Sequence, residues 1–436
     1  MEANKIIKNA GWLIGAKVIQ SIISLIVSML TARFLGPSNF GLINYAASIV
    51  AFVAPIMYLG FNGILVKEIV AAPEKEGEIL GTAVTLSFIS GIICIAGVIS
   101  FACIVNAGET VTIVVCALYS ILLLFQSLEL ISYWFQAKLL SKYYSIVSFI
   151  AYSIVAVYKV FLLITQKSVY WFSISNALDY MLISVMLFVI YKKKSSYKLK
   201  FSKEIARTMF AESKYYILSD MMVAVFAQTD KIMLKLMIGD SATGFYSAAV
   251  ACSSITMFIF TAIIDSMRPS VFENKASDEG RYKQSVTVLY SIIIYLSLIQ
   301  SVFITLFSGF IIKILYGDGY APGVTALRIV VWYTTFSYIG GIRNIWLLAE
   351  KKQKYMLFIN IFGALLNVVL NFVLIPVLQM NGAAIASLIT QFFANVILGF
   401  IIKPIRDNNK LMMKALNPMI LINGIKSFKR KKTIVQ

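Results

Sequence analysis

The sequence contains no histidine, and only 14% of its residues are charged. Histidine is the commonest general base near neutral pH and the commonest metal ligand, so its absence removes the usual catalytic and metal chemistry. The four cysteines, at positions 94, 103, 116 and 252, lie in or beside apolar runs and lack metal-site spacing. We therefore expect no structural disulfide, no zinc site and no cofactor.

Acidic residues are also scarce, because 20 Asp and Glu face 39 Lys and Arg, for a formal net charge of +19. The cations gather in short links between apolar blocks, and nucleic-acid-binding motifs are absent, so we do not expect a nucleic-acid partner. Hydrophobic residues make up 59% of the chain, above the share of a soluble protein. The apolar blocks are about 20 residues long, enough to cross a bilayer as a helix. The sequence therefore predicts an all-α polytopic membrane protein.

The apolar blocks predict about twelve transmembrane helices, six before the polar segment 191–214 and six after it. Their ranges are 12–33, 41–66, 80–104, 111–136, 143–165, 169–191, 215–237, 244–267, 286–314, 324–348, 355–376 and 382–403. An even number of spans gives both halves the same orientation, as in a parallel repeat. We expect an N-terminal lobe (1–190), a basic linker (191–214), a C-terminal lobe (215–403) and a basic tail (404–436), with a central cavity between the two lobes.

Two glycine-containing turns support this duplication. Gly36 and Gly41 in the first turn match Gly239 and Gly244 in the second, at a constant offset of 203 residues, and an Ala-Ala pair follows each turn. Glycine is required where φ turns positive or where two backbones approach closely. A second pair of similar segments, 137–143 and 349–355, follows in the same order. Matching segments in the same order indicate an internal repeat.

The loop charges predict the orientation. Thirty of the 39 Lys and Arg residues lie in the even-numbered links and at the two termini, which places both termini in the cytoplasm. The odd-numbered links are too short to hold a catalytic domain. The first apolar run continues to Leu30 without a convincing cleavage site, so we expect an uncleaved first helix. The basic linker has two interpretations: an anchor to anionic lipid headgroups, or a topology determinant and hinge.

Polar residues inside the predicted spans are the candidate functional residues, because burying them in a membrane is costly. The first span carries a polar face that includes Lys17, and the seventh carries Asp230 and Lys231. We expect both faces to point toward a cavity. The cationic candidates for substrate contact are Lys17, Lys231, Arg343, Lys159 and Arg328. The candidates for ion coupling are Asp179, Asp220 and Asp230. For each of them, pairing with a neighbouring helix is the structural alternative.

Four segments resemble the bacterial polysaccharide transporters, also called O-antigen flippases, of the multidrug/oligosaccharidyl-lipid/polysaccharide exporter superfamily. They are the opening Asn9-Ala-Gly-Trp12, the turn 33–41, the segment Thr229-Asp-Lys-Ile-Met-Leu234 and the block 239–249. The resemblance implies a flippase, not an enzyme, that moves an undecaprenyl-pyrophosphate-linked oligosaccharide across the bacterial cytoplasmic membrane by alternating access. It implies membrane lipids, the lipid-linked oligosaccharide, and polysaccharide polymerase and chain-length proteins as partners.

The sequence leaves three other functions open. A multidrug or cation antiporter of the same superfamily would favour an acidic cavity, whereas the candidates here are mixed to basic. A membrane enzyme of polysaccharide assembly would need a large outer loop with catalytic groups, and the outer links are too short. A non-transporting scaffold would require neither buried charges nor a repeat.

Overall fold

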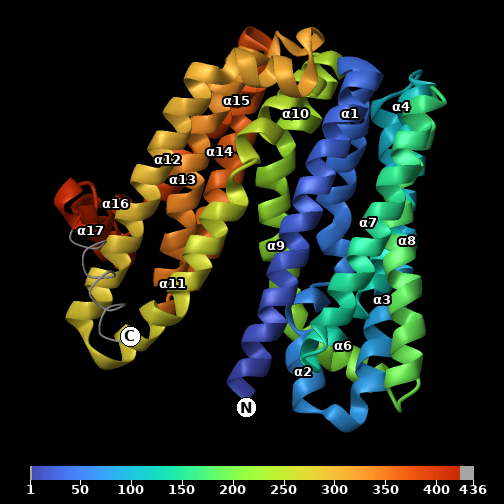
Figure 1. The fold of residues 1–436 in the computed structure, drawn as a ribbon, viewed down its shortest axis with the longest axis horizontal. Helices are drawn as coiled ribbons and strands as arrows, with labels where there is room; N and C mark the ends of the chain where they lie inside the picture. The colour runs from blue at the N-terminus through green and yellow to red at the C-terminus, as the bar shows by residue number, and fades with distance from the viewer. Residues whose placement is uncertain (1, 423–436) are drawn as a thin grey trace. The chain divides into compact units, whose positions relative to one another are not determined.

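The computed structural model describes the backbone of residues 2–422 and the side chains of that range except 2–10, 13, 14, 16 and 17. The described chain is helical and contains no strand, as predicted (Figure 1). Its helices are α1 Glu2–Tyr58, α2 Leu65–Ala71, α3 Glu76–Val105, α4 Thr110–Ser120, α5 Leu122–Glu129, α6 Ser132–Ala137, α7 Ser141–Ile164, α8 Val169–Lys194, α9 Lys203–Met237, α10 Asp240–Ser254, α11 Met257–Ser277, α12 Glu279–Tyr316, α13 Gly323–Ala349, α14 Lys354–Leu378, α15 Met380–Phe392, α16 Leu398–Ile401 and α17 Arg406–Lys414.

The predicted spans fall on these helices, except that the second, predicted at 41–66, is helical in α1 only to Tyr58 and is then interrupted before α2. By length and apolarity, eight segments of the described chain can cross a membrane, or nine if the pair α10 and α11, bent by 42°, forms one span. The count of nine includes α1 once, although two spans are predicted on it. It does not include α9 and α13, which carry charged residues within the predicted spans. With these three additions the helices account for the twelve predicted spans, and the polytopic all-α fold is confirmed.

The helix α1 folds back on itself at Gly36. Its backbone there has φ 71° and ψ 172°, a conformation that residues with a side chain rarely adopt. In Figure 1 the two arms of α1 run up to this turn and back down from it. The predicted tight turn between two apolar runs is therefore confirmed, and it supplies two helical arms that face each other.

The second glycine turn lies between α9 and α10 and packs against the first. Gly239 has φ 122°, again in the region that favours glycine. A methyl group on Gly41 would lie 2.7 Å from the Gly244 nitrogen, and one on Gly244 would lie 2.8 Å from the Pro37 carbonyl carbon. Both expected uses of glycine occur: Gly36 and Gly239 adopt positive φ, and Gly41 and Gly244 permit close backbone contact.

Contacts between Cα atoms divide the chain into two compact units, Met1–Gly244 and Phe245–Gln436. In the first unit, apolar side chains from α1, α3, α4, α5 and α8 form one core cluster, and side chains from α2, α3, α6, α7, α8 and the start of α9 form another. The contacts thus group α9 with the first six spans, whereas the predicted lobes separate it from them. The predicted lobe boundaries remain a prediction.

The second unit has a core formed by α11, α12, α13 and the region around α16 and α17. A π-helix, Phe393–Ile397, interrupts the last predicted span between α15 and α16. The predicted basic tail begins with the short helix α17, whose Asn408, Asn409, Leu411 and Met412 are buried against this unit. Asn409 donates a hydrogen bond of 2.7 Å to the carbonyl of Val396 in the π-helix. One face of α17 is therefore part of the core.

The predicted linker is shorter than expected. Helix α8 continues to Lys194, and α9 starts at Lys203, where the Ser202 side chain accepts a hydrogen bond from the Ile205 nitrogen. Such an N-cap satisfies one of the free N–H groups at a helix start. Residues 203–214, which fall in the predicted linker, are instead the first part of α9, continuous with the seventh span.

Candidate functional site

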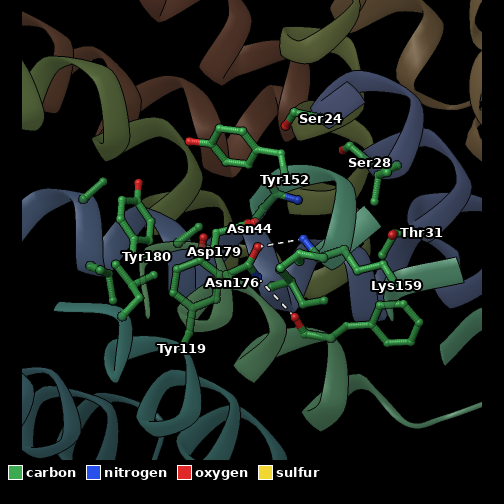
Figure 2. A pocket seen from close by; sticks show the side chains of 18 of the residues that line it. Ser24, Ser28, Thr31, Asn44, Tyr119, Tyr152, Lys159, Asn176, Asp179 and Tyr180 are labelled. Carbon is green, nitrogen blue, oxygen red and sulfur yellow. Dashed lines mark hydrogen bonds between the residues drawn. The ribbon is translucent and has the colours of Figure 1, made fainter. Parts of the chain in front are cut away.

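The first unit contains a partly open cavity of about 580 Å³ between both arms of α1 and the helices α4, α5, α7, α8 and α9. This volume lies in the range of about 300–1,000 Å³ that small-molecule sites have. The polar groups in its wall come from serine, threonine, asparagine, glutamine, tyrosine, lysine and aspartate side chains, several of which are labelled in Figure 2. A polar cavity inside a membrane-spanning unit must hold water or a polar ligand.

The polar face of the first span lines this cavity, as expected. Gln20, Ser24, Ser28 and Thr31 lie one turn apart on the first arm of α1, which puts them on one side of the helix. Gln20 donates a hydrogen bond of 2.5 Å to the Tyr152 hydroxyl on α7. The side chain of Lys17, one turn earlier, lies outside the described residues, so its predicted role stays a prediction.

Lys159 of α7 and Asp179 of α8 are both in the cavity wall. Lys159 donates a hydrogen bond of 3.0 Å to the side-chain oxygen of Asn176, drawn as a dashed line in Figure 2. Asn176 in turn donates to the Phe172 carbonyl, which fixes its oxygen toward the lysine. The ammonium group therefore contacts a neutral amide that an anion could replace.

Three buried oxygen atoms of the cavity wall, Thr31 Oγ1, Gln126 Oε1 and Asp179 Oδ1, have no hydrogen-bond partner among the described residues. Leaving a buried polar atom without a partner costs about 1–3 kcal/mol. Such atoms are normally satisfied by water or by a ligand. Their position in the wall indicates that the cavity is occupied by polar molecules when the protein is in a membrane.

Helix α9 contributes Gln228 and Lys231 to the wall. The neighbouring Asp230 is buried but does not line the cavity, so it points to another side of the helix. Asp220 lies about three turns before Lys231 and accepts a hydrogen bond of 3.3 Å from the Asn62 side chain. Of the three predicted ion-coupling carboxylates, the cavity contains only Asp179.

The two candidate arginines lie in the second unit. Arg343 of α13 is 3% exposed and donates to the Ala394 carbonyl in the π-helix, at 2.9 Å, and to the Asn344 side chain, at 3.2 Å. Arg328 donates to the Ser308 hydroxyl at 2.9 Å. These contacts fit a structural role for both arginines, and the predicted substrate contact through them stays a prediction.

Several residues of the wall were not predicted from the sequence, because that search followed charged residues. They are Asn44, Tyr119, Gln126, Tyr152, Asn176 and Tyr180. A usable signal exists in α8, where Asn176, Asp179 and Tyr180 follow the i, i+3, i+4 spacing of one helix face. The wall thus offers amide, hydroxyl and aromatic groups, which suit sugars, beside two ammonium groups, which suit an anion.

No group of three or more His, Cys, Asp or Glu side chains that could hold a metal occurs in the part of the chain that the structure describes.

Comparison with known proteins matches two family profiles. The profile described as "Polysaccharide biosynthesis protein" matches residues 6–275, more than half of the chain. The profile described as MatE matches residues 216–373. A curated relative, the uncharacterized membrane protein MJ1068 of Methanocaldococcus jannaschii, is 26% identical over 245 residues, which cover 51% of this chain and 47% of that protein. The chain therefore spans about half the length of this relative.

Solved structures share the fold at low sequence identity. The lipid II flippase MurJ in an inward closed conformation gives a TM-score of 0.70 at 14% identity, covering 95% of this chain and 92% of that one. An inward-facing multidrug resistance MATE transporter of the MOP superfamily gives 0.69 at 14% identity, covering 91% and 96%. A MOP superfamily transporter from Pyrococcus furiosus Vc1 gives 0.62 at 14%, covering 93% and 95%. At this identity the likeness shows the fold alone.

Proposed function

The chain belongs to the polysaccharide biosynthesis protein family of the MOP superfamily of transporters and flippases. On that basis we propose that it moves an undecaprenyl-pyrophosphate-linked oligosaccharide from the cytoplasmic to the outer face of the bacterial cytoplasmic membrane. The proposed cycle is alternating access, and no reaction is catalysed.

The observation that carries this proposal is the polar cavity of the first unit, which holds two lysines. A pyrophosphate with sugars attached is the part of a lipid-linked oligosaccharide that cannot cross hydrocarbon unaided. Lys159 and Lys231 would attract its charge, since electrostatic attraction strengthens where the local dielectric is low. The polyprenyl tail would stay in the surrounding lipid.

The hydrogen-bond pattern supports an exchangeable anion site at Lys159. Its present acceptor is the neutral amide of Asn176. A phosphate oxygen would replace this neutral acceptor with an ionised one, so the lysine would form an ion pair as well as a hydrogen bond. The tyrosine and amide groups nearby would then meet sugar hydroxyls, and the orphaned oxygen of Asp179 would accept one of them.

A second candidate function, a cation or multidrug antiporter, is favoured by Asp179 and by the match of residues 216–373 to the MatE profile. A carboxylate in the cavity would bind a cationic substrate or a coupling ion. However, the wall contains two lysines for one carboxylate, which favours an anionic substrate. Asp179 remains the proposed coupling carboxylate in either case.

The experiment uses the purified chain in vesicles that contain a fluorescent undecaprenyl-pyrophosphate oligosaccharide. Transfer across the bilayer is followed by quenching with a membrane-impermeant reagent. Lys159→Gln and Lys231→Gln should each slow transfer at least tenfold. The control is Lys167→Gln, which removes the same charge from an exposed position and should leave the transfer rate unchanged. Unchanged transfer in both cavity variants would overturn the proposal, and drug-gradient transport blocked by Asp179→Asn would favour the antiporter.

Deletion and topology experiments test the cellular part of the proposal. Loss of the gene should leave the lipid-linked unit on the inner leaflet and remove surface polysaccharide. Reporter fusions at both termini should be active only in the cytoplasm, because thirty of 39 cations lie in the even-numbered links and at the termini. Co-purification would test the expected polymerase and chain-length partners.

A further inference from the structure

The segment between α8 and α9 carries a dense group of exposed cations. From the end of α8 to the first turns of α9, all of the following side chains are exposed: Lys192, Lys193, Lys194, Lys198, Lys200, Lys203, Arg207 and Lys214. Glu204 and Glu212 are the acidic residues in the same range, so the segment has a net charge of +6. Glu212 is already paired with Lys67 at 2.7 Å. We name residues 195–202 the strap.

The strap is docked on the start of α3 by its backbone. The Lys200 nitrogen donates to the Gly77 carbonyl at 3.1 Å, and the Ser202 nitrogen donates to the Thr82 hydroxyl at 2.9 Å. A methyl group on Gly81 would lie 3.0 Å from the Lys200 carbonyl carbon, so the strap lies directly against the helix. These contacts fix the backbone from which the lysine side chains of the strap extend.

A buried carboxylate holds the first part of the strap. Glu76, at the start of α3, is 2% exposed. It accepts a hydrogen bond of 2.8 Å from the Ser195 hydroxyl and pairs with Lys138 at 2.6 Å. In addition, the Tyr191 hydroxyl donates to the Tyr197 carbonyl at 3.1 Å. These contacts join the strap to α3, α6 and α8.

Aromatic side chains are exposed among the cations. Tyr197 is 45% exposed, Phe201 is 53% exposed and Tyr215 is 70% exposed. Aromatic residues favour the level of lipid headgroups, and cations there attract anionic lipids. The strap directly follows α8, an apolar span that ends at Lys194, so it lies at the level where the membrane ends.

Topology alone explains the number of cations, since cytoplasmic links of membrane proteins are basic. It does not require the docked backbone, the buried Glu76 or the exposed aromatic rings. We propose that the strap and the start of α9 form a preorganised docking surface for anionic phospholipid headgroups of the cytoplasmic leaflet. This inference is independent of the head group that the cavity binds.

The test measures binding of phosphatidylglycerol relative to phosphatidylcholine by the full-length protein in mixed nanodiscs without lipid-linked sugar. Each cation near an anionic surface contributes about fivefold to binding. The double variant Lys198→Gln with Lys200→Gln should therefore reduce the preference for phosphatidylglycerol by an order of magnitude or more. The control, Lys351→Gln with Lys354→Gln, removes the same charge from another basic link and should change the preference less than threefold.

The variant Glu76→Gln tests whether lipid binding depends on the fixed position of the strap or on its positive charge alone. It retains every cation and makes the protein more positive, but it weakens the bonds that hold the strap. The preference for phosphatidylglycerol should fall at least threefold if preorganisation matters. An equal loss in the strap and control doubles, or an unchanged preference in the strap double, would overturn the proposal. An unchanged or increased preference for phosphatidylglycerol in Glu76→Gln would overturn the part of the proposal in which the docked strap is preorganised for lipid binding.

Discussion

Replacing Gly41 with alanine tests whether the two duplicated turns pack backbone to backbone. The new methyl carbon would lie 2.7 Å from the Gly244 nitrogen and 2.9 Å from the Asp240 carbonyl carbon, and closer still to the Asp240 oxygen. Ordinary contact begins at 3.4 Å, so the backbones must separate by at least 0.7 Å, the difference from 2.7 Å. Both partners are backbone atoms, which cannot move aside by rotating a side chain.

The expected cost follows from this geometry. Overpacking in a well-packed interior costs about 1–3 kcal/mol, and a clash with backbone on both sides belongs in the upper half of that range. For 150–250 residues, 1 kcal/mol shifts the melting temperature by about 2–4 °C. We therefore expect Gly41→Ala to lower the melting temperature by about 4–12 °C, measured by intrinsic fluorescence of the purified protein in nanodiscs.

The matched control is Gly97→Ala in α3, where a methyl group would meet nothing within 4 Å. Alanine is favoured over glycine inside a helix by roughly 0.5–1 kcal/mol, so this variant should melt at or slightly above the wild-type temperature. Gly244→Ala should resemble Gly41→Ala, and the double variant should cost less than the sum because both change one contact. Equal melting of Gly41→Ala and wild type would refute the backbone contact.

Three further predictions concern stability, each measured by the same melting assay. Gly36→Ala should cost about 1–3 kcal/mol through backbone strain alone, because φ is 71° and a methyl group there meets nothing within 4 Å; a neutral result would contradict the turn. A hydrogen bond of 2.6 Å from Lys235 lowers the pKa of Glu109 below its ordinary 4.5. The ionised Glu109 therefore stabilises the folded protein fully above pH 4.5, and this stabilisation is lost as the pH falls through the lower folded pKa. The loss of stability caused by Glu109→Gln should then be constant from pH 8 to 5 and should shrink only below about pH 4.5. A loss that disappears by pH 6 would contradict this assignment. Asn409→Ala leaves the Val396 carbonyl without its donor and should cost about 1–3 kcal/mol, whereas the exposed Lys410→Ala on the same helix should change stability by less than about 0.5 kcal/mol; equal effects would contradict the role of Asn409.

Much of the fold could be predicted because membrane spans depend on a local property, the length of an apolar run. The turn at Gly36 was also predictable, since a charged and glycine-containing break between two such runs leaves few alternatives. The linker was harder to predict. Its polar composition indicates a loop, but the start of α9 at Lys203 depends on the Ser202 cap and on contacts with α3, which are far away in sequence.

The site could be predicted only in part. The polar face of α1 follows from helical spacing, and Lys159, Lys231 and Asp179 were found because a charge within a span is rare. The tyrosines and amides of the wall were missed, because these residues occur in spans for many structural reasons. Nor does the sequence show which charges share a cavity, since that depends on how helices from distant parts of the chain pack.

The surroundings of the buried Lys235 and Arg343 and of the half-buried Lys159 explain why we propose Lys159 as the better ligand candidate. Lys235, 4% exposed, is neutralised by Glu109 at 2.6 Å and Asp240 at 2.9 Å. Arg343 donates to a backbone carbonyl of the π-helix. Lys159 instead contacts a neutral amide and faces a cavity. A buried charge normally needs a countercharge. An anion can reach Lys159 from the cavity, so we propose Lys159 as the position that contacts an anionic substrate.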